Sequence, residues 1–388
     1  MESPISIQSG GLLRADAPVR IDCIVGARPN FIKIAQILAE IRRRPSFQAR
    51  LIHTGQHFSP EMSDTFFREL ELPEPDINLG VGGGTATAQT AEIMRRLESI
   101  FVEGRPDLVL VVGDVNSTLA ATLVAAQIGI PVAHVEAGLR SFDRRMPEEI
   151  NRLLTDSVSS YLFTSEPSGT VNLLAEGVPQ EKIFHVGNVM IDTLVRFREK
   201  AKSSRILERL GLQPGEYAVT TLHRPSNVDD VTRLKALYEM LSGLSSSLPV
   251  VFPVHPRTQN KLAAFVQPSP GLLLTPPLGY LDFLHLMAES RLVLTDSGGI
   301  QEETTALQVP CLTIRENTER PITVDEGTNQ LVGLAPDAVL DAARGVLRNG
   351  SRPSRLPAFW DGQAARRILD ILEVRLCPAT ALNGRHSS

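Results

Sequence analysis

The stretch Thr295-Asp-Ser-Gly-Gly-Ile-Gln-Glu-Glu303 is a Gly-rich turn between an apolar, strand-like run and the start of a helix. Ser297, Gly298 and Gly299 would leave backbone N–H groups unpaired at the positive end of that helix, and the missing side chains would let a pyrophosphate approach closely. The Glu303 carboxylate, further along the helix, could accept hydrogen bonds from a ribose. In the alternative interpretation, Ser297 only caps the helix and the two glycines serve close packing.

The same alternation of short apolar runs with helical patterns extends over the whole chain. It is typical of α/β proteins with a parallel sheet covered on both faces. We predict two doubly wound, Rossmann-like units, residues 19–190 and 191–359, joined by a charged, helix-forming stretch at 192–210. A last helix at about 360–376 would pack back on the first unit, and a ligand cleft would lie between the carboxyl ends of both sheets. The predicted strands are 21–25, 49–53, 108–112, 131–135, 160–163 and 183–186 in the first unit, and 217–221, 250–254, 271–274, 291–294 and 309–313 in the second.

Length and composition bound the class of protein. The 388 residues suffice for two or three domains, and fractions of 42% hydrophobic and 21% charged residues are those of a soluble globular protein. A formal net charge of −5 argues against bulk attraction to nucleic acid or to an anionic membrane. An anionic ligand would therefore need a local cationic site.

The cysteines are widely spaced and predict reduced side chains rather than a disulfide framework. Cys23 and Cys311 lie in apolar, strand-like runs, and Cys377 lies in a tail. No apolar run reaches membrane-spanning length, and the N-terminus lacks the basic start and apolar core of a signal peptide. We expect a cytoplasmic protein with frayed ends at residues 1–18 and 376–388.

Basic residues follow several predicted strands, at the sheet edge where open parallel sheets bind ligands. Arg28 and Lys33 follow the first strand, although these two residues alone also fit a solvated helix start. In the second unit, His223 and Arg224 follow one strand and His255 follows another. A histidine beside an arginine suits a diphosphate that leaves as an anion. Because the first loop lacks G-x-G-x-x-G, we expect no dinucleotide cofactor.

Carboxylates gather at the same predicted edge. Asp114 and Glu136 follow neighbouring strands, whereas Glu148 and Glu149 occupy the first turn of a helix. Helix capping would also explain Asp114, and the helix dipole would also explain the adjacent pair of glutamates. Three acids that converge on one cleft would be available for proton transfer and for stabilising a sugar cation.

Two further patterns predict no site. His53 and His57 are four residues apart but straddle a glycine in a strand-to-loop turn, so we expect no zinc or other metal. Arg315, Glu319 and Arg320 form a charged loop, which by itself is typical of a solvated surface.

Nine short motifs stand in order along the chain. They are GARPNFIK (26–33), TGQH (54–57), GDVNSTLA (113–120), HVEAGLRS (134–141), PEEINR (147–152), LHRPSN (222–227), PVHPRT (253–258), TDSGGIQEE (295–303) and TERP (318–321). Together they resemble the non-hydrolysing UDP-N-acetylglucosamine 2-epimerases over about residues 20 to 375. The resemblance implies a GT-B fold with the active site between two Rossmann-like domains, in a cytoplasmic homodimer.

The resemblance also implies a reaction, the interconversion of UDP-GlcNAc and UDP-ManNAc. The C2 proton has no adjacent carbonyl to acidify it, and the chain lacks the fingerprint for a nicotinamide that could oxidise the sugar. The remaining route is anti elimination of UDP to 2-acetamidoglucal, followed by re-addition of UDP. Asp114, Glu136 and Glu148 resemble the acid/base carboxylates of the family, with the order of proton abstraction and donation left open. Arg28, Lys33, His223 and Ser297 resemble the residues of the family that contact the diphosphate and the leaving group. Glu303 resembles the family's ribose ligand.

The chain departs from the common family pattern in two places. Asn30 stands where GTRPE has its acid, and Phe58 stands where QHR has its arginine. Bacterial members bind a second, activating UDP-GlcNAc near that arginine. Gln56 and His57 remain as candidate effector residues, and the loss of the arginine predicts weakened activation.

Other UDP-sugar proteins remain as alternatives. Epimerases of UDP-2,3-diacetamido-2,3-dideoxyglucuronic acid share the GARPxFIK-like loop and TGQH, but typically read TEWVE where this chain has Thr318-Glu-Arg-Pro321. A hydrolysing epimerase would release free ManNAc. A GT-B glycosyltransferase would use the same phosphate turn without needing an acid on each face of C2, and a silent UDP-sugar sensor would not need the acids or His223.

Overall fold

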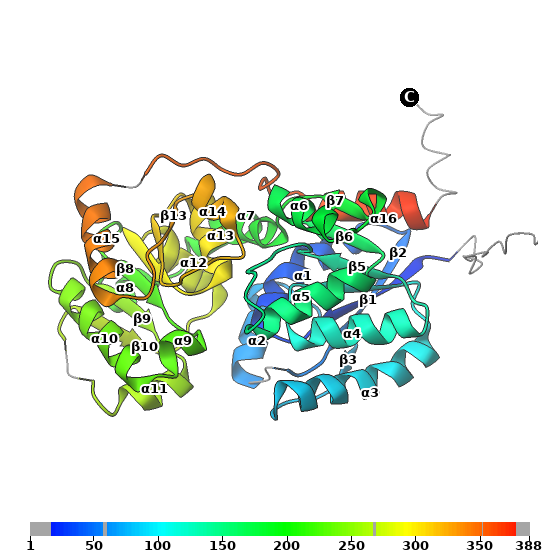
Figure 1. The fold of residues 1–388 in the computed structure, drawn as a ribbon, viewed down its shortest axis with the longest axis horizontal. Coiled ribbons are helices and arrows are strands. Elements are labelled where there is room, and N and C mark those ends of the chain that lie inside the picture. The colour runs from blue at the N-terminus through cyan, green and yellow to red at the C-terminus, as the bar shows by residue number, and fades with distance from the viewer. Residues whose placement is uncertain (1–16, 57–59, 267–268, 351, 378–388) are drawn as a thin grey trace, which may run out of the picture.

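The computed structural model describes residues 17–56, 60–266, 269–350 and 352–377, which form two α/β lobes side by side (Figure 1). Each lobe contains one parallel sheet with helices on both of its faces. The central strands are apolar along their whole length; every residue of Leu108–Val112, for example, is buried. Such strands require cover on both faces, which the helices provide. The predicted α/β class with two doubly wound parallel sheets is confirmed.

The first sheet has seven strands in the order β3-β2-β1-β4-β5-β6-β7. The chain reverses its direction of travel across the sheet between β1 and β4, so the loops after these strands diverge and leave a crevice at the carboxyl edge. The strands are β1 Val19–Val25, β2 Phe47–His53, β3 Ile77–Asn78, β4 Leu108–Val112, β5 Val132–Val135, β6 Tyr161–Thr164 and β7 Ile183–His185. The helices are α1 Arg28–Ile41, α2 Pro60–Glu69, α3 Ala86–Gly104, α4 Asn116–Gln127, α5 Pro147–Val158, α6 Pro167–Ala175 and α7 Val189–Ala201.

The second sheet has six strands in the order β10-β9-β8-β11-β12-β13, with the equivalent reversal between β8 and β11. The strands are β8 Ala218–Thr221, β9 Val250–Pro253, β10 Leu272–Thr275, β11 Leu292–Thr295, β12 Cys311–Thr313 and β13 Asn329–Leu331. The helices are α8 Ile206–Leu210, α9 Pro225–Val228, α10 Val231–Ser245, α11 Pro256–Leu262, α12 Tyr280–Ala288, α13 Gly298–Leu307, α14 Pro321–Asp325 and α15 Pro336–Asn349.

One apolar cluster runs from the first lobe into the second. It includes Phe31 of α1, Phe197 of α7 and Leu286 of α12, all buried. The rings of Phe197 and Tyr280 meet edge to face with centroids 6.4 Å apart. Helix α7 therefore ties the lobes together through buried apolar surface.

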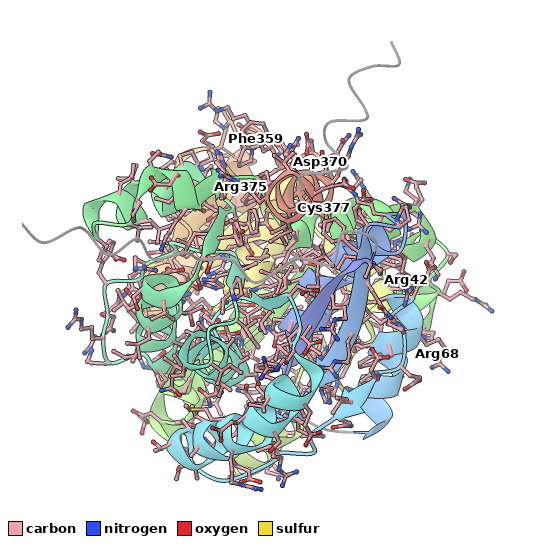
Figure 2. All side chains as sticks on the ribbon, turned by 90° about the vertical axis from the view of Figure 1, so that its right-hand side faces the viewer. Arg42, Arg68, Phe359, Asp370, Arg375 and Cys377 are labelled. Atoms are coloured by element: carbon pink, nitrogen blue, oxygen red, sulfur yellow. The ribbon has the colours of Figure 1, made fainter. Side chains whose placement is uncertain are left out.

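The last helix, α16 (Ala364–Leu376), leaves the second lobe and lies on the first (Figures 1 and 2). At the end of α1, the Arg44 guanidinium binds Asp370 of α16 at 2.7 Å and Glu373 at 3.1 Å. The backbone N–H groups that begin α16 donate to the buried Asp192 carboxylate of α7. The domain boundaries at 190/191 and 359/360 remain predictions.

The elements differ from the predicted ones in two respects. β3 and β13 were not predicted, because runs of two and three residues are too short for an alternation pattern. The stretch 192–210 forms two helices, α7 and α8, where we predicted one continuous pattern. The Ser204 hydroxyl accepts the Ile206 N–H at 3.1 Å, a local bond that begins a new helix instead of continuing the old one. Within the described ranges, no helix has the length and apolar composition needed to cross a membrane.

Candidate active site

The reversal points of the two sheets face each other, and side chains meet between them. Arg320 of the second lobe reaches the Glu136 carboxylate of the first, with 2.8 Å between Nη2 and Oε1. Arg224 lies 3.6 Å from the Glu148 carboxylate across the same gap. The carboxyl edges of both sheets therefore contribute to a single polar site, at the place where doubly wound sheets bind ligands.

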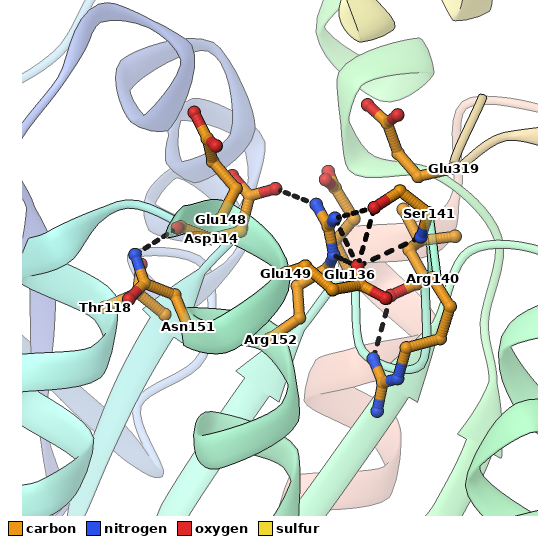
Figure 3. A network of polar contacts seen from close by, with 12 residues as sticks. Asp114, Thr118, Glu136, Arg140, Ser141, Glu148, Glu149, Asn151, Arg152 and Glu319 are labelled. Carbon is orange, nitrogen blue, oxygen red and sulfur yellow. Dashed lines mark hydrogen bonds and ion pairs between the residues drawn. The ribbon is translucent and has the colours of Figure 1, made fainter. Parts of the chain in front are cut away.

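Asp114 follows β4 and points into this site (Figure 3). Its carboxylate pairs with Arg152 of α5 at 2.5 Å, and the Asn151 side chain donates to the Asp114 carbonyl at 2.9 Å. Burial raises the pKa of Asp114, but the nearby cations Arg152, Lys33 and Arg320 outweigh it and the pKa lies below its usual value. Asp114 is therefore a carboxylate at neutral pH.

Glu136 follows β5 in a left-handed conformation, with a φ of +75°. Such a conformation costs a non-glycine residue about 1 to 3 kcal/mol and is concentrated at functional sites. The buried carboxylate lies between two cations, Lys33 Nζ at 2.7 Å and Arg320 Nη2 at 2.8 Å. A Cβ on Gly113 would come within 2.7 Å of Lys33 Nζ, so the glycine leaves room for this lysine. The strained backbone and two cations fix the position of the Glu136 carboxylate.

The adjacent acids at the start of α5 have different environments. Glu149 is buried and accepts the backbone N–H groups of Ser141 and Phe142 as well as the Arg152 guanidinium (Figure 3). Burial raises the pKa of Glu149, but these donors outweigh it and the pKa lies below its usual value. The Glu148 side chain is 38% exposed and faces Arg224 of the other lobe. Glu149 supports the loop, and Glu148 is the acid that reaches the gap.

The two cationic side chains of the first loop both contact other side chains of the protein. Arg28 lies over the ring of Phe66, with 4.3 Å from Cζ to the centroid, and burial lowers its pKa. Lys33 is buried against Glu136, as described above. Neither residue forms a solvated helix start. Arg28 packs against Phe66 of α2, whereas Lys33 pairs with Glu136 of the site.

The two histidines predicted for the second lobe follow β8 and β9. The His223 side chain is 54% exposed, and its Nδ1 lies 2.8 Å from a carboxylate oxygen of the fully buried Asp296. The next residue, Arg224, is mostly buried and lies 3.6 Å from both Glu148 and Glu319. His255 is exposed after β9, further from these contacts along the sheet edge.

The Gly-rich turn leads into α13 as predicted. Ser297 holds the N-cap position, yet its side chain accepts no hydrogen bond from the helix, so capping does not explain this serine. The glycines do serve close packing, since a Cβ on Gly298 would come within 2.5 Å of Arg320 and one on Gly299 within 3.0 Å of Met190. The first N–H groups of α13 remain available to an anion.

Glu303 lies on α13 behind this turn. It is buried, and its carboxyl group accepts the Tyr280 hydroxyl at 3.3 Å. Burial raises the pKa of Glu303 to about 8, against a smaller opposing effect of the tyrosine. A buried carboxyl with one weak partner is able to take further donors, as a ribose would supply.

The loop with Arg315, Glu319 and Arg320 is not a solvated surface, and that interpretation was wrong. All three side chains are buried. Arg320 binds Glu319 at 2.6 Å and Glu302 at 2.9 Å, in addition to Glu136. Glu136 and Glu302 lie outside this loop in the sequence, so charge pattern alone did not reveal them; the TERP motif was the available signal. Sequence reasoning also gave no role to Arg152 or Asp296.

The candidate effector region is described only in part. Gln56 is buried, and its side-chain oxygen accepts both the N–H and the hydroxyl of Ser117, at 3.1 and 2.8 Å. His57 and Phe58 lie outside the described residues. Where the structure is described, histidine, cysteine and acidic side chains form no group of three suited to a metal ion.

The sequence and the fold are similar to those of known proteins. A sequence model for the family described as UDP-N-acetylglucosamine 2-epimerase matches residues 39–373. The UDP-N-acetylglucosamine 2-epimerase of Methanocaldococcus jannaschii is 41% identical over 364 residues, which cover 91% of this chain and 99% of that protein. The UDP-2,3-diacetamido-2,3-dideoxy-D-glucuronate 2-epimerase of Pseudomonas aeruginosa is 40% identical over 362 residues, with the same coverage of 91% and 99%.

The crystal structure of the M. jannaschii UDP-GlcNAc 2-epimerase in complex with UDP-GlcNAc and UDP superposes with a TM-score of 0.86. The two sequences are 40% identical in this superposition, which covers 92% of this chain and 100% of the other. The fold is of the GT-B type, as predicted. Because the family model and these relatives span nearly all of the described residues, the chain belongs to the UDP-N-acetylglucosamine 2-epimerase family.

Proposed function

We propose that the protein interconverts UDP-GlcNAc and UDP-ManNAc by anti elimination of UDP, through 2-acetamidoglucal, and re-addition. The observation that carries the proposal is the pairing of acids of the first lobe with cations of the second, Glu136 with Arg320 and Glu148 with Arg224. Elimination across C1 and C2 needs a proton acceptor at C2 and an anion stabiliser at C1 of the same sugar. These two kinds of group meet in this cleft.

The second lobe holds the nucleotide in this proposal. The diphosphate lies at the start of α13, against the N–H groups after Ser297, and Glu303 accepts the ribose hydroxyls. As the C1–O bond breaks, negative charge grows on the diphosphate. Arg224 and the exposed His223 stabilise that charge more in the transition state than in the ground state, which is the condition for raising the rate.

The first lobe handles the proton at C2. Asp114 is ionised at neutral pH and therefore accepts a proton rather than donating one. The fixed Glu136 and the partly exposed Glu148 complete the set of acid/base groups for the two faces of C2. Because Glu148 is 38% exposed, its proton can exchange with water. Solvent hydrogen would then appear at C2 of the product.

The test is NMR of the purified protein with UDP-GlcNAc in deuterated water. We expect UDP-ManNAc to form and deuterium to enter at C2 of both epimers, without added metal or nicotinamide. Conversion with retention of the C2 proton would contradict elimination. Release of free ManNAc would instead show hydrolysis, and an unchanged spectrum would show that UDP-GlcNAc is no substrate.

A second candidate is epimerisation of UDP-2,3-diacetamido-2,3-dideoxyglucuronic acid, which the similarity to the P. aeruginosa enzyme favours. That sugar carries a second acetamido group and a carboxylate, so its site needs a further cation. Arg320, an arginine of this site, is already paired with Glu136, Glu302 and Glu319. We therefore expect faster turnover of UDP-GlcNAc when the two substrates are compared at equal concentration.

We also propose that the protein is a cytoplasmic homodimer whose product supplies polysaccharide synthesis, as the family resemblance implies. α5 carries Ile150, Leu154 and Val158 along one face, with 38%, 43% and 41% of each residue exposed. A stripe of this kind, four residues apart, is suited to packing against a second copy. Analytical ultracentrifugation should show a dimer, and Leu154→Asp should shift it towards the monomer without loss of helical content.

A further inference from the structure

Asp296 is the one acid of the TDSGG turn, and it contacts the imidazole of His223. The carboxylate is fully buried, and one of its oxygens lies 2.8 Å from His223 Nδ1. Asp296 follows β11 and His223 follows shortly after β8, and these strands are parallel neighbours with Thr295 opposite Thr221. The two side chains therefore meet because the carboxyl ends of adjacent strands lie at the same edge.

We propose that Asp296 is the positioning residue for His223: it holds the ring in the tautomer protonated at Nδ1 and leaves Nε2 facing the leaving diphosphate. The role of His223 in this statement rests on the proposed function. A carboxylate accepts hydrogen bonds only, so a neutral imidazole beside it must carry its proton on Nδ1. Nε2 then lies on the far side of the ring from Asp296, in a side chain that is 54% exposed.

The surroundings of Asp296 fix which oxygen serves the histidine. Oδ2 accepts the backbone N–H of Arg224 at 2.9 Å and the amide of the buried Asn227 at 3.1 Å. The backbone N–H of His223 lies 3.1 Å from Oδ1 and 3.0 Å from Oδ2. Burial raises the pKa of Asp296, but the bonds from His223 and Asn227 bring it below its usual value. Asp296 is therefore ionised, and both of its carboxylate oxygens accept hydrogen bonds.

This arrangement makes Asp296→Asn a selective probe. The new amide has one acceptor oxygen, and the donors from Arg224 and Asn227 require it at the Oδ2 position. Its NH₂ group must then face His223 Nδ1, which forces the neutral ring to carry its proton on Nε2. The variant keeps the Oδ2 acceptor for the backbone N–H groups of His223 and Arg224 and changes the tautomer, so it separates positioning from folding.

The first test can be decided on the wild-type residue at Asp296. Protein labelled with ¹⁵N-histidine is examined by long-range ¹H–¹⁵N NMR without nucleotide, and His223→Gln identifies the signals of His223. We expect the neutral ring to be protonated at Nδ1, and Asp296→Asn to shift the proton to Nε2. A wild-type ring protonated at Nε2 would overturn the proposal even if the Asn variant failed to fold.

The second test is kinetic. Asp296→Asn should lower kcat by about a hundredfold, the usual scale for a misplaced acid or base, while the Kd for UDP changes less than about twofold. Asp192→Asn is the matched control, because Asp192 is also a buried acceptor of two backbone N–H groups but lies under α16. Normal turnover of Asp296→Asn overturns the proposal. Wild-type protein that fails to epimerise UDP-GlcNAc refutes the proposed function instead, while the tautomer still tests Asp296.

Discussion

At the scale of single residues, neighbouring acids in the sequence differ in function because their surroundings differ. Glu149 is enclosed by donors of its own lobe, whereas Glu148, one residue earlier, faces Arg224. The pair on α13 shows the same contrast: Glu302 binds Arg320 and Asn188, whereas among the described residues Glu303 accepts a hydrogen bond only from the Tyr280 hydroxyl. In each pair one carboxylate holds the structure together and its neighbour remains open to a ligand.

The pair at the start of α5 gives the first prediction. Glu148→Gln should lower turnover by at least about a hundredfold, because it removes an acid/base group and little else. Glu149→Gln should instead lower the melting temperature, since removing one partner of a buried pair costs about 3 to 5 kcal/mol. Turnover of both variants and thermal unfolding by circular dichroism check this. A Glu148 variant that melts far below the parent would show that the two assignments are reversed.

The second prediction uses the raised pKa of Glu303, about 8 against an ordinary 4.5. The folded protein without nucleotide keeps this group protonated at pH 7, and ribose donors favour its ionised form. UDP binding should therefore release up to one proton near pH 7, and the affinity should rise as the pH approaches 8. The stability from this group has the opposite trend: it is full below about pH 4.5 and is lost as the pH rises through about 8.

Calorimetry of UDP binding in buffers of different ionisation enthalpy measures the number of protons released on binding. Glu303→Gln cannot release it and should bind UDP more weakly, by about 1.5 to 3 kcal/mol for the lost charged hydrogen bond. Proton release that is unchanged in Glu303→Gln would exclude this residue as the source.

At the scale of elements, the sequence predicted those features of the site that depend on the local pattern of apolar and polar residues. Asp114 and Glu136 were placed at strand ends because apolar runs and their lengths define parallel strands. Arg320 was misjudged because its burial depends on Glu136, a partner 184 residues away. Asp296 was overlooked because its partner follows a different strand. Long-range pairing of elements, which no local window contains, therefore accounts for the missed part of the site.

The turn before α13 gives a prediction at this scale. Gly298→Ala should lower turnover by roughly tenfold or more and cost about 1 to 3 kcal/mol of stability, as overpacking does. The new Cβ would come within 2.5 Å of Arg320 and 2.6 Å of Glu319, and the ion pairs of these side chains prevent them from moving aside. Turnover and denaturant unfolding check both effects.

Gly243, inside α10, is the matched control. A Cβ there would meet nothing within 4 Å. Gly243→Ala should therefore stabilise the protein by about 0.5 to 1 kcal/mol and leave turnover unchanged. Equal behaviour of the two variants would show that the close packing at Gly298 has no part in the site.

At the scale of the whole molecule, the polar site between the lobes is not lined by unpaired positive charges. Lys33, Arg224 and Arg320 are each paired with acids of the site, and Arg224 and Arg320 have partners in both lobes. A diphosphate that binds here must compete with these acids for the hydrogen bonds and positive charges of the three cations. Binding is therefore coupled to the contacts that hold the lobes together, so the relative position of the lobes should respond to the ligand.

The last prediction concerns one such contact, at the edge of the cleft. Glu69, at the end of α2, accepts the backbone N–H groups of Tyr280 and Leu281, which begin α12 in the other lobe. Its carboxylate serves as a cap for that helix across the gap between the lobes. Glu69→Ala should raise the KM for the UDP-sugar by about ten- to a hundredfold, since a hydrogen bond to a charged group contributes about 1.5 to 3 kcal/mol.

The expected cause is looser closure, so small-angle X-ray scattering should give a larger radius of gyration for Glu69→Ala in the presence of UDP. Glu71→Ala is the control: its side chain is 50% exposed and pairs with Lys200 and Arg196 on the surface, where such pairs contribute little. It should leave KM and the scattering unchanged. If Glu69→Ala kept the parent's KM and radius, the α2 to α12 contact would be an incidental cap, and closure would depend on the arginine pairs alone.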